Sequence, residues 1–200
     1  MIESWRAEWG TLLPFFYVEM NNMYAPQREP VEPAPLCLIR EEQQAALKLP
    51  KTGVVASIDL GIPEPHFPNK KPVGDRLAAL ALGEVYGFPK MSRRPEFLDA
   101  AFRPDGSVLL SFRHATGLGT REDAPIRGFA LRGEEGQWHW ADARLAGEQV
   151  ILRSREVPKP TAVRYAWAEN PIISLFNATG LPLRPFRTDT GSQASVTIDH

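Results

Sequence analysis

A single histidine, His66, stands in a proline-rich segment directly after a short apolar stretch. Two carboxylates precede it in the sequence, at Glu64 and Asp59. A general base needs a fixed orientation and a carboxylate partner, because the carboxylate holds the imidazole ring in place. These residue types at this spacing predict a catalytic base at His66, with either Glu64 or Asp59 as its acid partner. The alternative reading is a surface histidine without a catalytic role.

A nucleophile for this base is not evident in the sequence. Hydrolases that activate a serine commonly place it in a G-x-S-x-G turn between a strand and a helix, and no such motif occurs here. Ser57 lies inside an expected strand, where we expect it to pack or to form a hydrogen bond. The sequence therefore predicts a base without a nucleophile.

Other polar residues near His66 are candidates for binding or for structure. Asn69 could contact a polar substrate or could cap the helix that follows it. No H-x-x-x-H or H-E-x-x-H spacing occurs, and Cys37 is the single cysteine. The sequence therefore predicts neither a metal site nor a cofactor, and Cys37 is expected to be a buried core residue on a helix.

Alternating strands and helices must position these residues. Residues 13–20 and 53–61 are typical of buried strands, and residues 36–49 and 73–87 are typical of amphipathic helices. Active sites of open α/β sheets gather at the carboxyl ends of strands, so we expect His66 at that edge. A doubly wound sheet usually has about five or six strands, and we therefore expect the two strands here to be part of a larger sheet. In the first helix, the inward face is predicted to hold Leu36, Ile39, Gln43, Ala46 and Leu47.

After Gly87 the pattern changes to short strands separated by turns, including a hairpin around Pro104–Gly106. This spacing is typical of a β-sandwich. We therefore predict an α/β plus all-β fold: a partial doubly wound α/β segment over residues 1–90, a β-sandwich over residues 91–190 and a polar tail over residues 191–200.

Composition excludes several classes of partner. The 200 residues are 43% hydrophobic and 24% charged, and their net charge is −1, which gives no electrostatic case for nucleic acid. No apolar run is long enough for a membrane span. The first ten residues are not a signal peptide, because Glu3, Arg6 and Glu8 interrupt any apolar core. The sequence leaves the localisation open.

Long blocks of the sequence resemble a known family between about Trp5 and Asp189. The blocks are WRAEWG, PFFYVEMNN, APQREPVE, IREEQQAALKLPKTGVVASIDLG, HFPNKKPVGDRLAALAL, VPKPTAVRYAWAENP and ATGLPLRPFRTD. They look like the C-terminal half of the sialate O-acetylesterases, which are carbohydrate esterases of the SGNH hydrolase superfamily.

The resemblance implies an SGNH-type, flavodoxin-like α/β domain and a Ser–His–Asp mechanism that removes O-acetyl groups from sialic acid or related sugars. His66 matches the family's catalytic histidine. The family's serine lies in an upstream Gly-x-Ser-Asn segment that has no counterpart in this chain. Glu64 stands where the family usually has an aspartate, and Asp59 matches a second family aspartate at the strand end.

The resemblance also implies partners and further site residues. Asn21 and Asn22 follow the first strand and could bind sugar hydroxyls or could cap a turn. The expected partners are an O-acetylated sugar and the missing N-terminal half of the esterase, either on a longer chain or as a separate polypeptide. The family is commonly secreted or periplasmic. The alternative is a non-catalytic fragment or degenerate member that binds carbohydrate or another protein.

Overall fold

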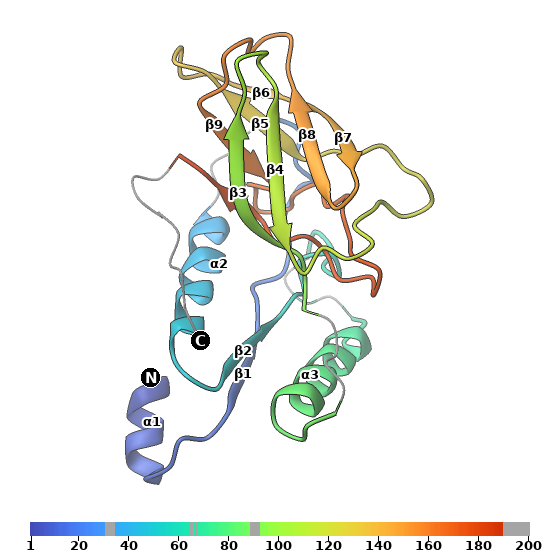
Figure 1. Cartoon of the computed structure of the whole chain (residues 1–200). Helices are drawn as coiled ribbons and strands as arrows, with labels where there is room; N and C mark the ends of the chain where they lie inside the picture. Colours follow the sequence, from blue (N-terminus) through green and yellow to red (C-terminus); the bar gives the residue numbers. More distant parts are fainter. Residues whose placement is uncertain (31–34, 65, 67, 89–92, 190–200) are drawn as a thin grey trace.

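The computed structural model describes residues 1–30, 35–64, 66, 68–88 and 93–189. The predicted tail over 191–200 and the predicted domain boundary at residue 90 lie outside this range. In Figure 1 an α/β part lies below a set of antiparallel strands, and the helices α2 and α3 stand on either side of a pair of strands, β1 and β2. No helix in the described part has the length and apolarity that a membrane span needs.

The α/β part begins with a helix and continues as a parallel strand–helix–strand unit. Strands β1 and β2 are parallel, with Phe15 opposite Thr52. The elements in chain order are α1 (Ile2–Trp9), β1 (Phe15–Val18), α2 (Pro35–Ala45), the short 3₁₀ helix η1 (Ala46–Lys48), β2 (Thr52–Val55) and α3 (Lys71–Glu84). Both strands are shorter than expected, and two strands do not test the doubly wound SGNH topology, which stays a prediction.

The buried face of α2 matches the predicted face in part, since Leu36 is buried as expected. Ile39 is 41% exposed, whereas Cys37 and Arg40 are buried. The inward Gln43 bonds with β1: its amide nitrogen donates to the Val18 carbonyl, and its amide oxygen accepts from the Met20 amide. The prediction is therefore confirmed at Leu36 and Gln43 and wrong at Ile39, because Arg40, whose guanidinium has backbone partners, lies on the inner face instead.

Two four-stranded antiparallel sheets follow, in the orders β3-β4-β8-β7 and β10-β9-β5-β6. The predicted hairpin around Asp105 is confirmed, although its first strand begins earlier than expected. The strands are β3 (Glu96–Phe102), β4 (Val108–Arg113), β5 (Phe129–Arg132), β6 (Trp138–Trp140), β7 (Asp142–Ala146), β8 (Gln149–Arg153), β9 (Ala162–Tyr165) and β10 (Phe186–Arg187).

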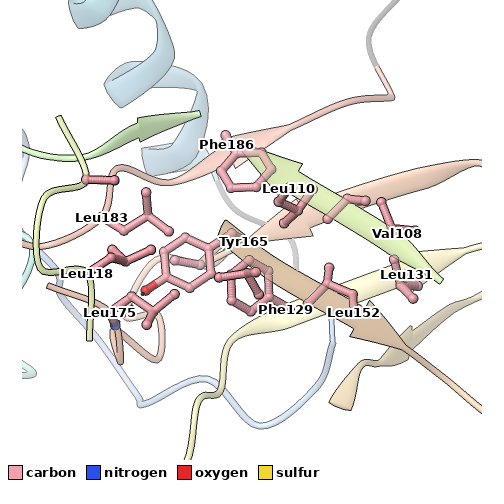
Figure 2. Packing of buried hydrophobic residues seen from close by; sticks show 14 of the residues in the cluster. Val108, Leu110, Leu118, Phe129, Leu131, Leu152, Tyr165, Leu175, Leu183 and Phe186 are labelled. Carbon is pink, nitrogen blue, oxygen red and sulfur yellow. Dashed lines mark hydrogen bonds between the residues drawn. The ribbon is translucent and has the colours of Figure 1, made fainter. Parts of the chain in front are cut away.

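The core of this part lies between the two sheets (Figure 2). Leu110 and Leu152 come from one sheet, and Phe129 and Tyr165 come from the other; all four are fully buried. The Tyr165 hydroxyl accepts hydrogen bonds from the backbone amides of Ser174 and Leu175, which satisfies its polar end inside the core. Alternating apolar residues thus form one interior, as in a β-sandwich.

Arg40 joins the α/β part to the sandwich. Its buried guanidinium donates to the carbonyls of Met20 and Asn21 after β1 and to those of Ala168 and Glu169 after β9. Cys37, one helical turn earlier, donates its thiol hydrogen to the Ala168 carbonyl. Burial raises the pKa of the Cys37 thiol to about 11 and lowers the pKa of Arg40. This packing keeps the end of β1 in a defined position relative to the sandwich.

A buried ion pair strengthens the same junction. Glu19, directly after β1, accepts a hydrogen bond from Arg94 at 2.6 Å, and both side chains are at most 5% exposed. Arg94 is thus buried against the α/β part.

A candidate catalytic site around His66

The loop that carries His66 begins where the ends of β1 and β2 meet. Asn22, four residues beyond β1, bonds with both backbone groups of Gly61: its Oδ1 accepts from the Gly61 amide at 2.8 Å, and its Nδ2 donates to the Gly61 carbonyl at 3.3 Å. The Tyr24 amide then donates to the Pro63 carbonyl at 2.9 Å. The two loops therefore run side by side and hold the start of the His66 segment.

Asn22 is itself held from the sandwich side. Its Nδ2 donates to Oδ1 of Asn170 at 2.9 Å, and Nδ2 of Asn170 donates to the Tyr24 carbonyl. Asn22 and Asn170 thus connect β1, the His66 loop and the segment after β9. Asn22 thus caps a turn, which was one of its two expected roles. Both the oxygen and the nitrogen of its side-chain amide form hydrogen bonds with protein groups.

Gly61 has no room for a side chain. A Cβ atom at this position would lie 2.2 Å from Oδ1 and 2.4 Å from the backbone oxygen of Asn22. Real Cβ atoms do not approach other atoms this closely, so only glycine permits the two loops to touch. The close approach explains why a glycine follows the strand at this point.

His66 and Glu64 both lie on the exposed surface of this loop. Within the described residues, neither side chain forms a hydrogen bond or an ion pair with another. An imidazole with open ring nitrogens is accessible to a reacting group from outside. In the part of the chain that the structure describes, both ring nitrogens of His66 are therefore available.

Asp59 occupies a different environment from Glu64. Its carboxylate is 2% exposed and forms a bidentate pair with Arg76 of α3, at 2.7 and 2.9 Å. Arg121, from the sandwich, approaches the same carboxylate at 3.4 Å. Arg76 also donates to the Ala56 carbonyl at 2.8 Å. Asp59 thus fixes α3 against the end of β2.

The remaining candidates divide between structural and free side chains. Asn21 donates to the backbone carbonyl of Asn22 at 2.9 Å. Asn69 is exposed and does not cap α3, because the helix is preceded by Lys70. The Ser57 hydroxyl is buried and donates to the Glu19 carbonyl at 2.6 Å. Ser57 is therefore a structural residue, as expected, and not the nucleophile for His66.

The described residues contain no group of three or more His, Cys, Asp and Glu side chains that could hold a metal ion. On the segment that follows β2, the loop offers an exposed imidazole and, two residues earlier in the sequence, an exposed carboxylate. Sequence reasoning missed Arg76 and Arg121 as parts of this region. Their contacts with Asp59 span 17 and 62 residues, and no local pattern signals contacts of that range.

Comparison with known proteins gives a likeness among solved structures. No family model and no curated protein matches the chain. Among solved structures, the chain is similar to a carbohydrate acetylesterase from Xanthomonas citri, with 40% sequence identity and a TM-score of 0.86. The match covers 96% of this chain and 45% of that protein, so this chain spans less than half of its length. The likeness supports a relationship to the carbohydrate esterases.

Proposed function

We propose that this chain supplies the catalytic histidine of a carbohydrate acetylesterase. The observation that carries the proposal is the placement of His66: an accessible imidazole on a loop that Asn22 anchors at the carboxyl ends of β1 and β2. Catalytic groups of open α/β sheets gather at this edge. The likeness to the Xanthomonas citri acetylesterase, over nearly all of this chain, supports the same assignment.

In the proposed mechanism, His66 accepts the proton of a serine hydroxyl as the serine oxygen attacks the acetyl carbonyl carbon. The bond between the carbonyl carbon and the sugar oxygen then breaks, and the imidazolium returns the proton to that oxygen. A water molecule next gives a proton to His66 and attacks the acyl-serine, which releases acetate and restores the serine. The serine comes from outside these 200 residues.

Glu64 is the better candidate for the acid that orients His66. It lies two residues before the histidine and has no ion-pair partner within the described residues. Asp59 is buried and already shares both carboxylate oxygens with Arg76. Moving Asp59 toward the imidazole would cost this ion pair and leave Arg76 without its partner.

The proposed substrate is an O-acetylated sugar, with sialic acid as the first candidate and acetylated xylose, mannose or rhamnogalacturonan units as alternatives. Asn69 is exposed near the histidine and is free to contact sugar hydroxyls, as is the side-chain oxygen of Asn21. A sugar-binding role for the sandwich alone has less support. Arginine guanidinium groups already stack on Trp138 and Trp167, at 4.6 and 4.7 Å from the ring centroids.

A chimeric enzyme tests this function. In the Xanthomonas citri acetylesterase, the matching 45% is replaced by this chain, and acetate release is measured from 9-O-acetylated sialic acid and from acetylated xylose. We expect the chimera to release acetate from at least one of these O-acetyl sugars. A chimera that unfolds cooperatively but releases no acetate from any O-acetyl sugar would contradict the proposal. Release from acetylated xylose alone would contradict only the sialate assignment.

A further inference from the structure

Tyr24 is an exposed aromatic residue beside the loop that carries His66. Its side chain is 53% exposed, and within the described residues it forms no hydrogen bond and no ring contact. The Tyr24 amide donates to the Pro63 carbonyl at 2.9 Å. His66 follows Pro63 by three residues, a length of chain that spans at most about 11 Å. Tyr24 therefore stands close enough to His66 for one ligand, larger than a single sugar ring, to contact both.

The backbone around Tyr24 is held from the sandwich side as well. The Tyr24 carbonyl accepts a hydrogen bond from Nδ2 of Asn170 at 2.8 Å, and the amide of Met23 donates to the Glu169 carbonyl at 3.3 Å. The Met23 side chain is buried, whereas its neighbour Tyr24 is exposed. Because both the sandwich and the His66 loop fix this backbone, the exposed ring belongs to a defined surface.

Tyr24 also has a strained backbone conformation, with φ at +69°. Bulky residues rarely adopt a positive φ, because the Cβ atom then crowds the backbone. Such conformations persist where the surrounding contacts enforce them, and they gather at sites that bind ligands. Glycine adopts this conformation without strain, so packing of the turn alone does not require an exposed tyrosine here.

The large exposed hydrophobic side chains elsewhere lack this combination of features. In the part of the chain that the structure describes, Tyr24 is the one such side chain with a positive φ. Trp5 and Trp9 lie on α1, before β1, and Tyr86 follows α3 and is 69% exposed. Since α3 has 14 residues and rises about 1.5 Å per residue, its length of roughly 20 Å separates Tyr86 from the His66 loop. Tyr86 therefore serves as a matched control for Tyr24.

The chemistry of this surface fits a sugar. A tyrosine ring offers two apolar faces and one polar hydroxyl, and a pyranose ring likewise has apolar C–H faces and polar hydroxyl edges. The side chains of Glu64 and Asn69, on the segment that follows Pro63, are exposed and polar. A single apolar ring among polar groups suits a sugar ring with hydroxyls around it better than it suits a continuous apolar chain.

We infer that Tyr24 is a stacking platform for the sugar unit next to the acetylated one, and that it makes the enzyme select acetylated oligosaccharides over acetylated monosaccharides. The inference rests on the proposed function, because it places the acetylated sugar at His66. The ring acts on substrate binding and takes no part in proton transfer. Tyr24 is therefore a specificity-determining residue.

Matched pairs of substrates test this role in the chimera. The pairs are 9-O-acetylated sialyllactose with 9-O-acetylated sialic acid, and acetylated xylotriose with acetylated xylose. We expect kcat/KM to be at least tenfold higher for the oligosaccharide of the active pair. Tyr24→Ala should abolish this preference, mainly through KM, whereas Tyr24→Phe and the control Tyr86→Ala should keep it. A chimera without the preference, or an equal loss by Tyr24→Ala on both members of a pair, would overturn the inference.

Calorimetry gives a second test that needs no turnover. Binding of acetylated xylotriose and of 9-O-acetylated sialyllactose is measured on the His66→Ala chimera, with and without Tyr24→Ala. We expect Tyr24→Ala to weaken the tighter of the two at least tenfold. No binding, or equal affinities in the two proteins, would overturn the stacking role. An active chimera with that result would leave the proposed function intact, and Tyr24-dependent binding by a chimera that releases no acetate before the His66 change would do the reverse.

The strained backbone gives a third test. Tyr24→Gly should raise the melting temperature of the isolated chain, because glycine adopts a positive φ freely and little buried surface is lost. The same change in the chimera should abolish the preference for the oligosaccharide. A lowered melting temperature would show that the ring stabilises the fold, and it would overturn the inference.

Discussion

Asn22 bonds with both backbone groups of Gly61, 39 residues further along the chain, and this pair fixes the start of the His66 loop. The side chain of one residue and the absence of a side chain in the other are both necessary. A carboxamide supplies one donor and one acceptor at the spacing of a peptide group, and glycine allows the close approach. The position of the proposed base thus depends on a contact between the loops that follow two neighbouring strands.

Replacement of Asn22 by alanine should destabilise the protein. The change leaves both backbone groups of Gly61 and the Oδ1 atom of Asn170 without their present partner, and unsatisfied groups of this kind cost about 1–3 kcal/mol. The measurement is the free energy of unfolding in urea. Asn69→Ala is the control, since Asn69 is exposed, and it should change stability by less than about 0.5 kcal/mol. Equal effects of the two changes would contradict the anchoring role of Asn22.

Replacement of Gly61 by alanine should also destabilise the protein, by about 1–3 kcal/mol, because the added methyl group overlaps Asn22. Gly74→Ala is the matched control. Gly74 lies in α3, and no heavy atom stands within 4 Å of a Cβ atom at that position. Alanine favours helix over glycine by about 1 kcal/mol, so this change should raise the melting temperature. If Gly61→Ala also raised the melting temperature, the prediction would be contradicted. The loops that carry Asn22 and Gly61 would then separate easily enough to admit the methyl group.

The two carboxylates before His66 should respond differently to neutralisation. Asp59→Asn should lower the free energy of unfolding by about 2–4 kcal/mol, because it removes the charge that compensates the mostly buried Arg76. Glu64→Gln should leave stability unchanged and lower acetate release by the chimera about tenfold or more. A stable Asp59→Asn chimera with lost activity, beside a fully active Glu64→Gln chimera, would assign the acid role to Asp59.

The Cys37 thiol should make the fold sensitive to alkaline pH. Burial raises its native pKa to about 11 from an ordinary value of 9.0. Between these values the unfolded chain releases the proton and the native chain keeps it, so stability is lost as pH rises from about 9 to about 11. The loss should approach roughly 2–3 kcal/mol, at 1.36 kcal/mol for each pKa unit.

Urea unfolding at several pH values checks this prediction. Cys37→Ala should remove most of the decline between pH 9 and 10. A smaller decline should remain at higher pH, because burial also raises the pKa of Tyr17 and of Tyr165. An identical pH dependence in the wild-type chain and in Cys37→Ala would contradict the assignment.

The sequence predicted the order of the elements well because periodicity and turn residues are local signals. Hairpins such as the one around Asp105 need only a turn and two apolar runs. The sequence also placed His66 and Asn22 after neighbouring strands, since carboxyl ends of parallel strands share an edge. The hairpin and the placement of His66 and Asn22 were each predicted from residues only a few positions away in the sequence.

Sequence reasoning failed where polar groups are satisfied by distant backbone. Arg40 lies on the inner face of α2 because carbonyls after β1 and β9 accept its hydrogen bonds. Periodicity placed Ile39 on that face, since a pattern counts apolar residues and contains no hydrogen-bond partners. The pairing of Arg94 with Glu19, which stands 75 residues earlier, likewise has no local signal in the sequence.

The central claim is that His66 is the base of an acetylesterase whose nucleophile lies outside this chain. The most direct test is the initial rate of acetate release by the chimera with and without His66→Ala, with the isolated 200-residue chain as the reference. We predict a loss of at least a thousandfold in the variant and no turnover by the isolated chain. Undiminished release by the His66→Ala chimera, or turnover by the isolated chain that requires His66, would contradict the claim.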